Sequence, residues 1–394
     1  MEARTMSDQA ILTINAGSSS IKFSVYARDG EPQELGRGQV EKLGPAARLV
    51  VHPEGASALR EEIGQADHDI ALQQILSHLE PILQGRQVVG VGHRIVHGGA
   101  EFAVPHVLTP DVIDQLALLE PLAPLHQPFN LAAVRAAMAA FPDALQIACF
   151  DTGFHRGHPW AFDTFALPRR YFDKGVRRYG FHGLSYDYIA GELARRDPVL
   201  ARGRVIVAHL GNGASMCAIK GGQSQSSTMG FSALEGLAMG TRSGAIDPGV
   251  LLYLMEAEGM GAADLTQLLY KESGLKGLSG LTHDMRSLLA SPAPEAAQAI
   301  EYYVMRIRHE LGGLTADIGG LDALVFTGGV GQNAAKIRAL VCDGMEWLGL
   351  SLDAAANENG VDEIGRGPVR IFALPTDEER VIARAVNGFL APGG

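Results

Sequence analysis

The sequence predicts an α/β fold with two domains, and three observations lead to this prediction. The chain has 394 residues, which is more than a single hydrophobic core usually serves. Short apolar runs of strand length alternate with amphipathic stretches of helical period along the chain. A strand–turn–strand pattern near the start also returns in similar form in the middle of the chain.

The first two strands are expected to form a β-hairpin. Ile11–Ile14 is an apolar run, and Ile21–Tyr26 begins with the alternation of a half-buried strand. Between them, Asn15–Ser20 is rich in hydroxyls and in residues that tolerate unusual backbone angles. With Lys22, this turn offers N–H groups and hydroxyls to an anion such as phosphate. From these residues alone, an ordinary polar hairpin is an equal alternative.

The remaining elements follow from the same two periodicities. Further strands are predicted at Val88–Val91, Gln146–Phe150, Val205–His209, Met216–Ile219, Ala323–Thr327 and Val369–Leu374. The clearest helix is Ser291–Ile318, with Ser291 as N-cap, Pro292 in the first turn and Gly319-Gly320 at its end. Shorter helices are predicted at Asp111–Leu119, Asn130–Ala140, Tyr186–Arg195 and Asn333–Leu348.

The internal repeat lies at Val205–Ile219, where an apolar strand, a glycine-containing polar turn and a second apolar strand follow one another. Gly17 and Gly211 hold equivalent places in the two copies. Coincidence is an alternative, because glycine turns between strands are common. If the repeat is real, two related domains that divide near Asp151 each present a phosphate-binding hairpin to a shared cleft.

Composition limits the classes of partner. A net charge of −11 argues against nucleic acid or an acidic membrane, although local arginines can still bind an anionic substrate. Three scattered cysteines without a CxxC motif indicate reduced thiols in a cytoplasm rather than a disulfide frame or zinc site. No apolar stretch reaches membrane-spanning length, and the first ten residues lack a signal-peptide core. Met1–Gln9 is expected to be a loose extension.

A third glycine-rich segment, Leu324–Arg338, places a glycine loop between a buried strand and a helix. Glycines let the backbone approach a ligand closely, and a helix N-terminus offers unpaired N–H groups. The segment matches neither a P-loop nor a dinucleotide fingerprint. It therefore indicates a nucleotide only weakly, and a tight strand–helix turn is the alternative.

Charged residues in glycine-rich settings are the candidates for chemistry. Arg94 and Arg242 carry planar forks suited to carboxylate and phosphoryl oxygens, with surface ion pairing as the alternative for each. His182 is a candidate metal ligand, base or donor to phosphoryl oxygens. Asp151, at the end of a strand, and Glu378 or Glu379 are candidates to hold Mg²⁺, which needs only one or two protein carboxylates.

At these residues the chain resembles the acetate kinase family. Nine segments carry the resemblance, in the family's order and over nearly the whole chain from Ile11 to about Arg384: 14–22, 92–99, 123–126, 150–155, 178–183, 209–215, 239–244, 326–331 and 375–379. Each segment alone is weakly specific, but nine in order are a strong indication.

The resemblance implies the fold of acetate and sugar kinases, Hsp70 and actin, with two duplicated actin-like or ribonuclease-H-like α/β domains around a nucleotide cleft. The N-terminal domain would span residues 10–150 and the nucleotide-binding domain residues 151–377, with a final helix at about 378–391 packing back on the first. The implied reaction is reversible phosphoryl transfer from ATP to acetate, with Mg²⁺ or Mn²⁺, in a cytoplasmic homodimer.

The resemblance also implies a role for each matching residue. The catalytic set would be Asp151, His182, Arg242 and Arg94. Arg94, Val96, Leu125, Phe181 and Ala233 would bind the substrate, while Asn15 and Glu378 would hold the metal. The nucleotide set would be Ser18, Ser20, Lys22, His209, Leu210, Gly211, Asn212, Gly213, Asp284, Met285, Arg286, Gly329, Val330, Gly331, Gln332 and Asn333.

Three of the departures from the family pattern bear on the choice of acyl group. The family usually has Thr and His where Leu184 and Tyr186 stand, and Pro where Ala233 stands. Trading a proline ring for a methyl group should enlarge the acyl pocket, so a propionate or short-chain acyl kinase is the nearest alternative. A non-catalytic nucleotide-binding module of the Hsp70 or actin type is the alternative from another class.

Overall fold

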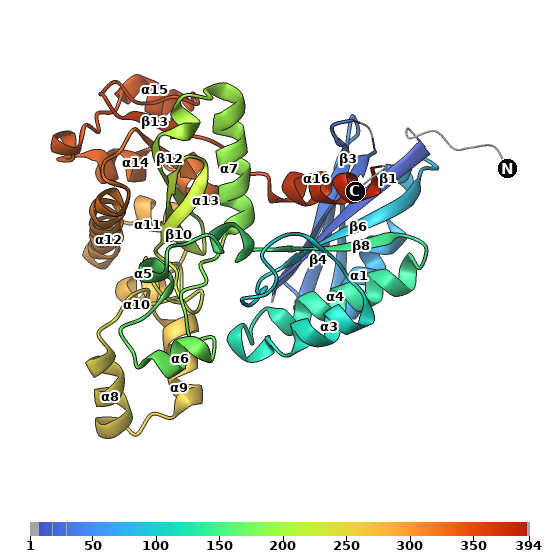
Figure 1. Cartoon of the computed structure of the whole chain (residues 1–394), viewed down its shortest axis with the longest axis horizontal. Coiled ribbons are helices and arrows are strands. Elements are labelled where there is room, and N and C mark those ends of the chain that lie inside the picture. The colour runs from blue at the N-terminus through green and yellow to red at the C-terminus, as the bar shows by residue number, and fades with distance from the viewer. Residues whose placement is uncertain (1–7, 18, 29, 392–394) are drawn as a thin grey trace. The chain divides into compact units, whose positions relative to one another are not determined.

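The computed structural model describes residues 8–17, 19–28 and 30–391. The chain forms two compact units (Figure 1). Unit 1 comprises Met1–Phe154 and Asp377–Gly394, and unit 2 comprises His155–Thr376. Within the described residues, no helix has both the length and the apolar character needed to span a bilayer.

Unit 1 is built on a mixed eight-stranded sheet. Its strands are β1 (Gln9–Ala16), β2 (Ser20–Ala27), β3 (Gln33–Glu41), β4 (Gly44–Pro53), β5 (Leu59–Ala66), β6 (Gln87–Ile95), β7 (His106–Val107) and β8 (Leu145–Phe150). They lie in the order β5-β4-β3-β2-β1-β6-β8-β7. β1, β6 and β8 are parallel neighbours, whereas the other pairs are antiparallel. Because Gln9 already belongs to β1, the expected N-terminal extension is wrong at that residue; residues 1–7 lie outside the described ones.

Helices cover this sheet on both faces. They are α1 (His68–Ser77), α2 (Glu80–Leu83), α3 (Pro110–Ala117), α4 (Gln127–Ala140) and α16 (Glu378–Leu390). α1 and α4 pack together on one face, and α16 packs on β1, β6 and β8 from the other (Figure 1). A Cβ at Gly92 of β6 would lie 2.3 Å from Ile382 Cγ2, so only glycine allows α16 this close an approach. The last helix is thereby fixed against the parallel strands.

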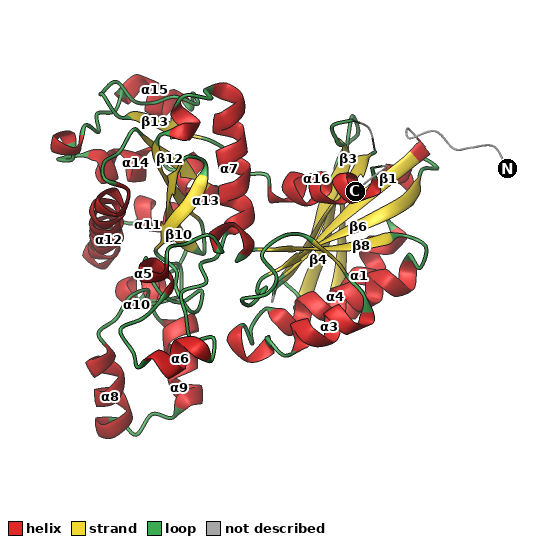
Figure 2. Cartoon of the chain, viewed as in Figure 1, coloured by secondary structure: helices red, strands yellow, loops and turns green. Residues whose placement is uncertain are grey.

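Unit 2 has a five-stranded mixed sheet surrounded by helices (Figure 2). Its strands are β9 (Arg204–Leu210), β10 (Ala214–Lys220), β11 (Gln223–Ser227), β12 (Ala323–Thr327) and β13 (Arg370–Ala373). Its helices are α5 (Trp160–Asp163), α6 (Arg169–Asp173), α7 (Gly183–Arg196), α8 (Pro248–Ala257), α9 (Ala262–Gln267), α10 (Gly274–Ser279), α11 (Met285–Ala290), α12 (Pro294–Ile318), α13 (Gly328–Asn333), α14 (Ala335–Cys342) and α15 (Ala354–Asn359).

The two sheets share one topology. The order β11-β10-β9-β12-β13 in unit 2 matches β3-β2-β1-β6-β8 in unit 1. Both series contain two antiparallel pairs followed by two parallel pairs. The β1–β2 and β9–β10 hairpins occupy equivalent places, which confirms the internal repeat. The α/β class with two mixed sheets flanked by helices is confirmed as well.

Each predicted helix exists, but its bounds differ from those of the structure, and two of these differences have a clear cause. The long helix begins at Pro294 after an Ala293 N-cap, whereas Ser291 is the C-cap of α11. Ala293 has extended backbone angles and is followed by proline at the first helical position, a start signal that the earlier Pro292 obscured. The helix predicted at Asn333–Leu348 is α14, which begins only at Ala335 and ends at Cys342, because Asp343 has extended backbone angles and Gly344 follows with a φ of +69°.

Candidate active site

The parallel strands of unit 1 bring the first set of predicted site residues together. Asn15 lies near the end of β1, Arg94 near the end of β6, and Asp151 directly after β8. Because neighbouring parallel strands end at the same edge of a sheet, these three side chains gather there. Glu378, the first residue of α16, joins them because that helix packs on the same strands.

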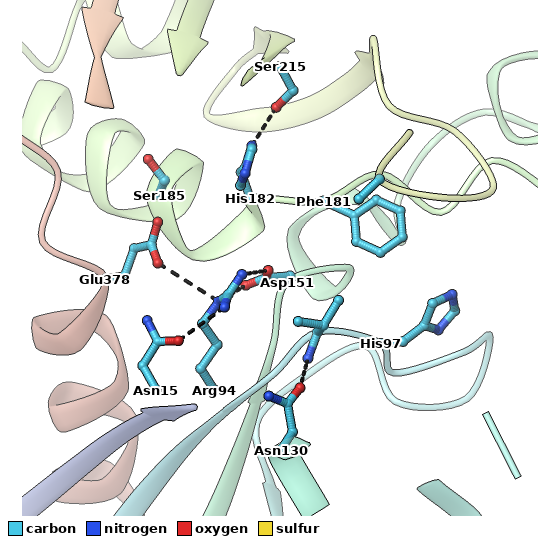
Figure 3. Close-up of polar contacts among 12 residues, drawn as sticks. Asn15, Arg94, His97, Asn130, Asp151, Phe181, His182, Ser185, Ser215 and Glu378 are labelled. Atoms are coloured by element: carbon cyan, nitrogen blue, oxygen red, sulfur yellow. Dashed lines mark hydrogen bonds and ion pairs between the residues drawn. The ribbon is translucent and has the colours of Figure 1, made fainter. Parts of the chain in front are cut away.

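Arg94 is the centre of this cluster (Figure 3). Its Nε donates to Asp151 Oδ1 at 3.0 Å, and its Nη2 donates to Asp151 Oδ2. Its Nη1 donates to Asn15 Oδ1 at 3.0 Å, and Glu378 Oε2 lies 3.9 Å from Nε. The side chain of Asp151 is only 2% exposed and that of Arg94 17%. This is a bidentate, almost buried ion pair.

The pKa values of the charged groups in this cluster are shifted strongly from their ordinary values. Burial raises the pKa of Glu378 to about 7; Asp151 and Glu379 add to this effect, while Arg94 and Lys22 oppose it. Burial also raises the pKa of Asp151 against the opposing influence of Arg94. For Arg94, burial favours the neutral form, but the neighbouring carboxylates outweigh it and raise the pKa. The cluster therefore has more negative charge than its own cations neutralise.

The side-chain oxygen atoms of this cluster are suitable ligands for a hard divalent cation. Asn15 Nδ2 lies 3.5 Å from Glu379 Oε1, so an amide and two carboxylates meet at the start of α16. Mg²⁺ prefers oxygen ligands and retains several waters, so one or two carboxylates suffice. No group of three or more His, Cys, Asp or Glu residues arranged to hold a metal occurs among the described residues. An incomplete protein shell of this kind suits a metal that shares its coordination with a phosphate-bearing substrate.

The other predicted residues of unit 1 lie around the same strand ends. Val96 is buried just after β6, and its N–H donates to Asn130 Oδ1 at 2.9 Å. Leu125 is half-buried in the turn before α4. Lys22 pairs in register with Asn15 across the β1–β2 hairpin, and Ser20 begins β2. Ser18 lies outside the described residues.

In unit 2 the central residue is His182, which caps the start of α7. Its φ of +57° is rare for a residue with a side chain and turns the chain sharply into the helix. Its ring stacks on His209 with centroids 4.3 Å apart, and its Nδ1 lies 2.8 Å from Ser215 Oγ (Figure 3). Phe181, immediately before it, is buried.

Arg242 and His182 both approach Gly213 in the β9–β10 turn. A Cβ at Gly213 would lie 3.4 Å from His182 Nε2 and 3.8 Å from Arg242 Nη1. Arg242 Nη1 also donates to the carbonyl oxygen of Ala233 at 2.9 Å, which fixes the guanidinium within its loop. A glycine turn, an imidazole and a guanidinium thus form a cradle suited to phosphoryl oxygens.

The predicted nucleotide segments of unit 2 also adjoin one another. Gly328, with a φ of +76°, lies so close to Leu210 that a Cβ would meet its carbonyl oxygen at 2.7 Å. This contact places α13 (Gly328–Asn333), which contains the predicted residues Gly329–Asn333, beside the β9–β10 turn. Gly240 lies against Asn212 Oδ1 and His283, so the start of α11 at Asp284–Arg286 approaches the same turn. Arg286 itself is exposed and paired with Asp284 at 3.2 Å.

Two residues of the site, Asn130 and Ser215, were not predicted from the sequence. Asn130 links Val96 to the carbonyl oxygen of Ala16 at the end of β1, and Ser215 contacts His182. Ser215 is the last residue of the motif that begins at His209. Its place in that motif was the only sequence signal that pointed to Ser215. Asn130 lay inside a predicted helix with no chemical signal at all.

Comparison with known proteins agrees with this geometry. The family model of the acetokinase family matches residues 10–384. An acetate kinase from Methylocella silvestris is 52% identical over 95% of this chain and 96% of its own length. One from Rhodopseudomonas palustris is 49% identical over 99% of this chain and 100% of its own length.

Solved structures agree as well. The acetate kinase of Porphyromonas gingivalis has a TM-score of 0.88 at 39% identity, covering 97% of this chain and 100% of its own. A propionate kinase from Francisella tularensis has a TM-score of 0.89 at 33% identity, covering 96% and 98%. The fold is therefore that of these kinases. The chain belongs to the acetokinase family.

Proposed function

We propose that this protein is an acetate kinase, which transfers the γ-phosphoryl group of ATP to acetate and forms ADP and acetyl phosphate reversibly. Unit 1, with α16, would be the N-terminal domain and unit 2 the nucleotide-binding domain. Family membership supports the reaction class. The choice of a carboxylic acid as the acceptor rests on the N–H groups of Arg94 that its neighbours leave unoccupied.

Arg94 has donors left for a carboxylate. A guanidinium has five N–H groups, and Asp151 and Asn15 occupy three of them within the described part of the chain. One N–H on Nη1 and one on Nη2 remain, which suffices to bind two carboxylate oxygens. Val96, Leu125, Phe181 and Ala233 would surround the methyl group of the acid.

The ion pair between Arg94 and Asp151 is also consistent with an acceptor that needs no general base to remove a proton. Acetate is ionised at neutral pH and can attack directly, whereas a sugar hydroxyl would have to lose a proton. Asp151 engages Arg94 with both of its oxygens, and its proposed role is to hold and balance that guanidinium. Such a role is sufficient for a carboxylate nucleophile.

Direct in-line attack on the γ-phosphorus is the proposed chemical step. Arg242 and the Nε2 atom of His182 would donate to the equatorial oxygens as charge spreads over them. Asn15 and Glu378 would hold Mg²⁺, or Mn²⁺ in its place, and the ion supplies charge neutralisation for the ATP phosphates. The nucleotide would contact Ser20, Lys22, residues 209–213, residues 284–286 and residues 329–333.

A short-chain acyl kinase that prefers propionate is the second candidate. Ala233 stands where the family usually has proline, and one structural relative is described as a propionate kinase. A single methylene in an apolar pocket changes selectivity by only about 10- to 200-fold. We therefore expect propionate to be used, with acetate preferred.

We also propose a homodimer in a reducing, cytoplasmic setting. The three cysteines are free buried thiols, which supports the setting. No residue of α8 is buried, even though the helix is largely apolar. The exposed fractions of Val250, Leu252, Tyr253 and Met255 are 40%, 60%, 61% and 49%. An apolar helix without cover supports association with a second copy through this face.

The first test is trapping of the product with hydroxylamine, which converts an acyl phosphate to a coloured hydroxamate. We expect hydroxamate from acetate only when ATP and Mg²⁺ are both present, and a kcat/KM ratio of acetate to propionate below about 200. If ATP binds but neither acid yields hydroxamate, the protein is a nucleotide-binding module and the proposal fails. A ratio below one would identify the propionate-preferring alternative.

The second prediction separates the two arginines. Arg242→Ala should lower kcat by about 100- to 1,000-fold with little change in KM, because its donors act on charge that develops in the transition state. Arg94→Ala should chiefly raise the KM for acetate, by about 10- to 100-fold, because it removes a charged hydrogen-bonding partner. Arg195→Ala, at a 68% exposed side chain, is the matched control and should match the wild type. A pure KM effect for Arg242→Ala would remove it from the phosphoryl step.

The third prediction concerns the α8 surface. Leu252→Asp should convert the dimer to a monomer, as measured by light scattering, because it buries a charge in the proposed interface. Leu118→Asp, at a 79% exposed leucine of unit 1, is the control and should leave the mass unchanged. A wild-type protein that is monomeric at micromolar concentration would contradict the proposed assembly.

A further inference from the structure

Tyr186 is a fully buried tyrosine on the first turn of α7. It follows His182 by one helical turn, and its backbone N–H donates to the carbonyl oxygen of His182 at 3.1 Å. Its side-chain hydroxyl forms a hydrogen bond with Ser215 Oγ, and Ser215 Oγ lies 2.8 Å from His182 Nδ1. Tyr186 and Ser215, which we call the hydroxyl relay, therefore form a chain of hydrogen bonds that ends at the imidazole of His182.

The relay restricts where the protons lie. Ser215 Oγ carries one hydrogen, and within the described residues it meets the Tyr186 hydroxyl on one side and His182 Nδ1 on the other. A phenol is a stronger hydrogen-bond donor than an alcohol because it is the more acidic group. Donation from Tyr186 to Ser215 leaves the serine hydrogen for Nδ1. A neutral imidazole that accepts at Nδ1 carries its proton on Nε2.

Nε2 is the nitrogen that faces the phosphoryl cradle. It lies near Gly213, on the same side as Arg242 Nη1, as the distances to a Cβ at Gly213 indicate. An imidazole with the proton on Nε2 can donate to a phosphoryl oxygen, whereas the other neutral tautomer would present a lone pair to it. The tautomer of His182 therefore decides whether the cradle attracts or repels its anion.

Tyr186 is itself held by a second buried histidine. The ring of His155 meets that of Tyr186 edge-on, with centroids 5.6 Å apart. Burial lowers the pKa of His155 to about 4, so it is neutral at pH 7. Its Nε2 donates to the carbonyl oxygen of Phe181 at 3.0 Å, and its Nδ1 accepts from Ser224 Oγ at 2.8 Å. One buried group thus supports both the Tyr186 ring and the turn that leads into His182.

We propose that Tyr186 is a positioning residue, which acts through Ser215 to keep His182 in the tautomer with a hydrogen on Nε2. This inference rests on the proposed function for its catalytic meaning, because it assigns Nε2 to the transferring phosphoryl group. It gives a role to a position at which the sequence departs from the family pattern.

The experiment combines nitrogen NMR of ¹⁵N-histidine-labelled protein with steady-state kinetics. His182→Asn identifies the signals of His182 among those of the 13 histidines. In ligand-free wild type, His182 should show an unprotonated Nδ1 and a protonated Nε2. In Tyr186→Phe, the spectrum should move toward a mixture of the two tautomers. kcat should fall about 3- to 10-fold, as expected for one lost neutral hydrogen bond, with both KM values within about twofold.

Two matched controls separate this effect from packing. Tyr303 is a buried tyrosine of unit 2 whose hydroxyl has no hydrogen-bond partner in the described chain, so Tyr303→Phe should change neither spectrum nor kcat. Ser215→Ala should reproduce the tautomer change and lower kcat at least as much as Tyr186→Phe. Ser227→Ala, which removes a buried hydroxyl that also has no partner in the described chain, should be silent.

The outcomes are distinct. Wild-type His182 with its proton on Nδ1, or Tyr186→Phe with the wild-type spectrum and kcat, overturns the proposal. If Tyr186→Phe does not fold, Ser215→Ala decides in the same way. The spectra need no turnover. A tautomer shift in a protein without acetate kinase activity would therefore support the positioning role while refuting the proposed function.

Discussion

The ion pair between Arg94 and Asp151 is the constraint on which the site in unit 1 depends. Both side chains are largely removed from water, and removing one partner of such a pair costs about 3–5 kcal/mol because the other is left uncompensated. The pair is formed where β6 and β8 end, so the register of the parallel sheet sets its position. Asn15 and Glu378 are then arranged around a guanidinium that cannot move far.

The same pair leaves an electrostatic imbalance that the proposed reaction can use. Asp151 pairs with Arg94, and Glu378 and Glu379 remain beside them, while Arg94 and, more weakly, Lys22 oppose the rise in the pKa of Glu378. The raised pKa of Glu378 reflects this crowding together with burial. A divalent cation would relieve the crowding, so in the proposed reaction binding of the metal would be coupled electrostatically to Arg94.

Unit 2 uses the same topology with the opposite chemistry. Its hairpin between β9 and β10 corresponds to the hairpin between β1 and β2, but the imidazole of His182 and the guanidinium of Arg242 approach the turn there. In the proposed reaction, one copy of the fold would bind the cation and the carboxylic acid, and the other the phosphoryl oxygens. A transfer reaction between an acid and a nucleotide needs both kinds of site.

Much of this arrangement could be predicted from the sequence because local patterns carried it. Every predicted strand exists. Glycine-rich motifs also marked the turn at Gly213, which His182 and Arg242 approach, and Gly328, whose backbone lies against Leu210. Strands β3 and β5 were missed because their residues are largely polar and only partly buried, so no clear alternation signalled them. Strand β4 was missed although it holds the buried apolar run Leu49–Val51. Ser215 was missed for another reason. Its contact with His182 exists only once β10 pairs with β9 and α7 packs nearby, which no local pattern reports. Tyr186 was visible only as a departure from the family.

In the proposed reaction, the phosphoryl group passes directly from ATP to a carboxylate held by Arg94, without a phosphorylated enzyme. The most direct measurement uses an ATP analogue whose γ-thiophosphoryl group is made chiral with oxygen isotopes, and determines the configuration at phosphorus in the acyl thiophosphate. A single in-line displacement predicts inversion of configuration. Retention would require two successive displacements through an enzyme side chain, and would contradict the account.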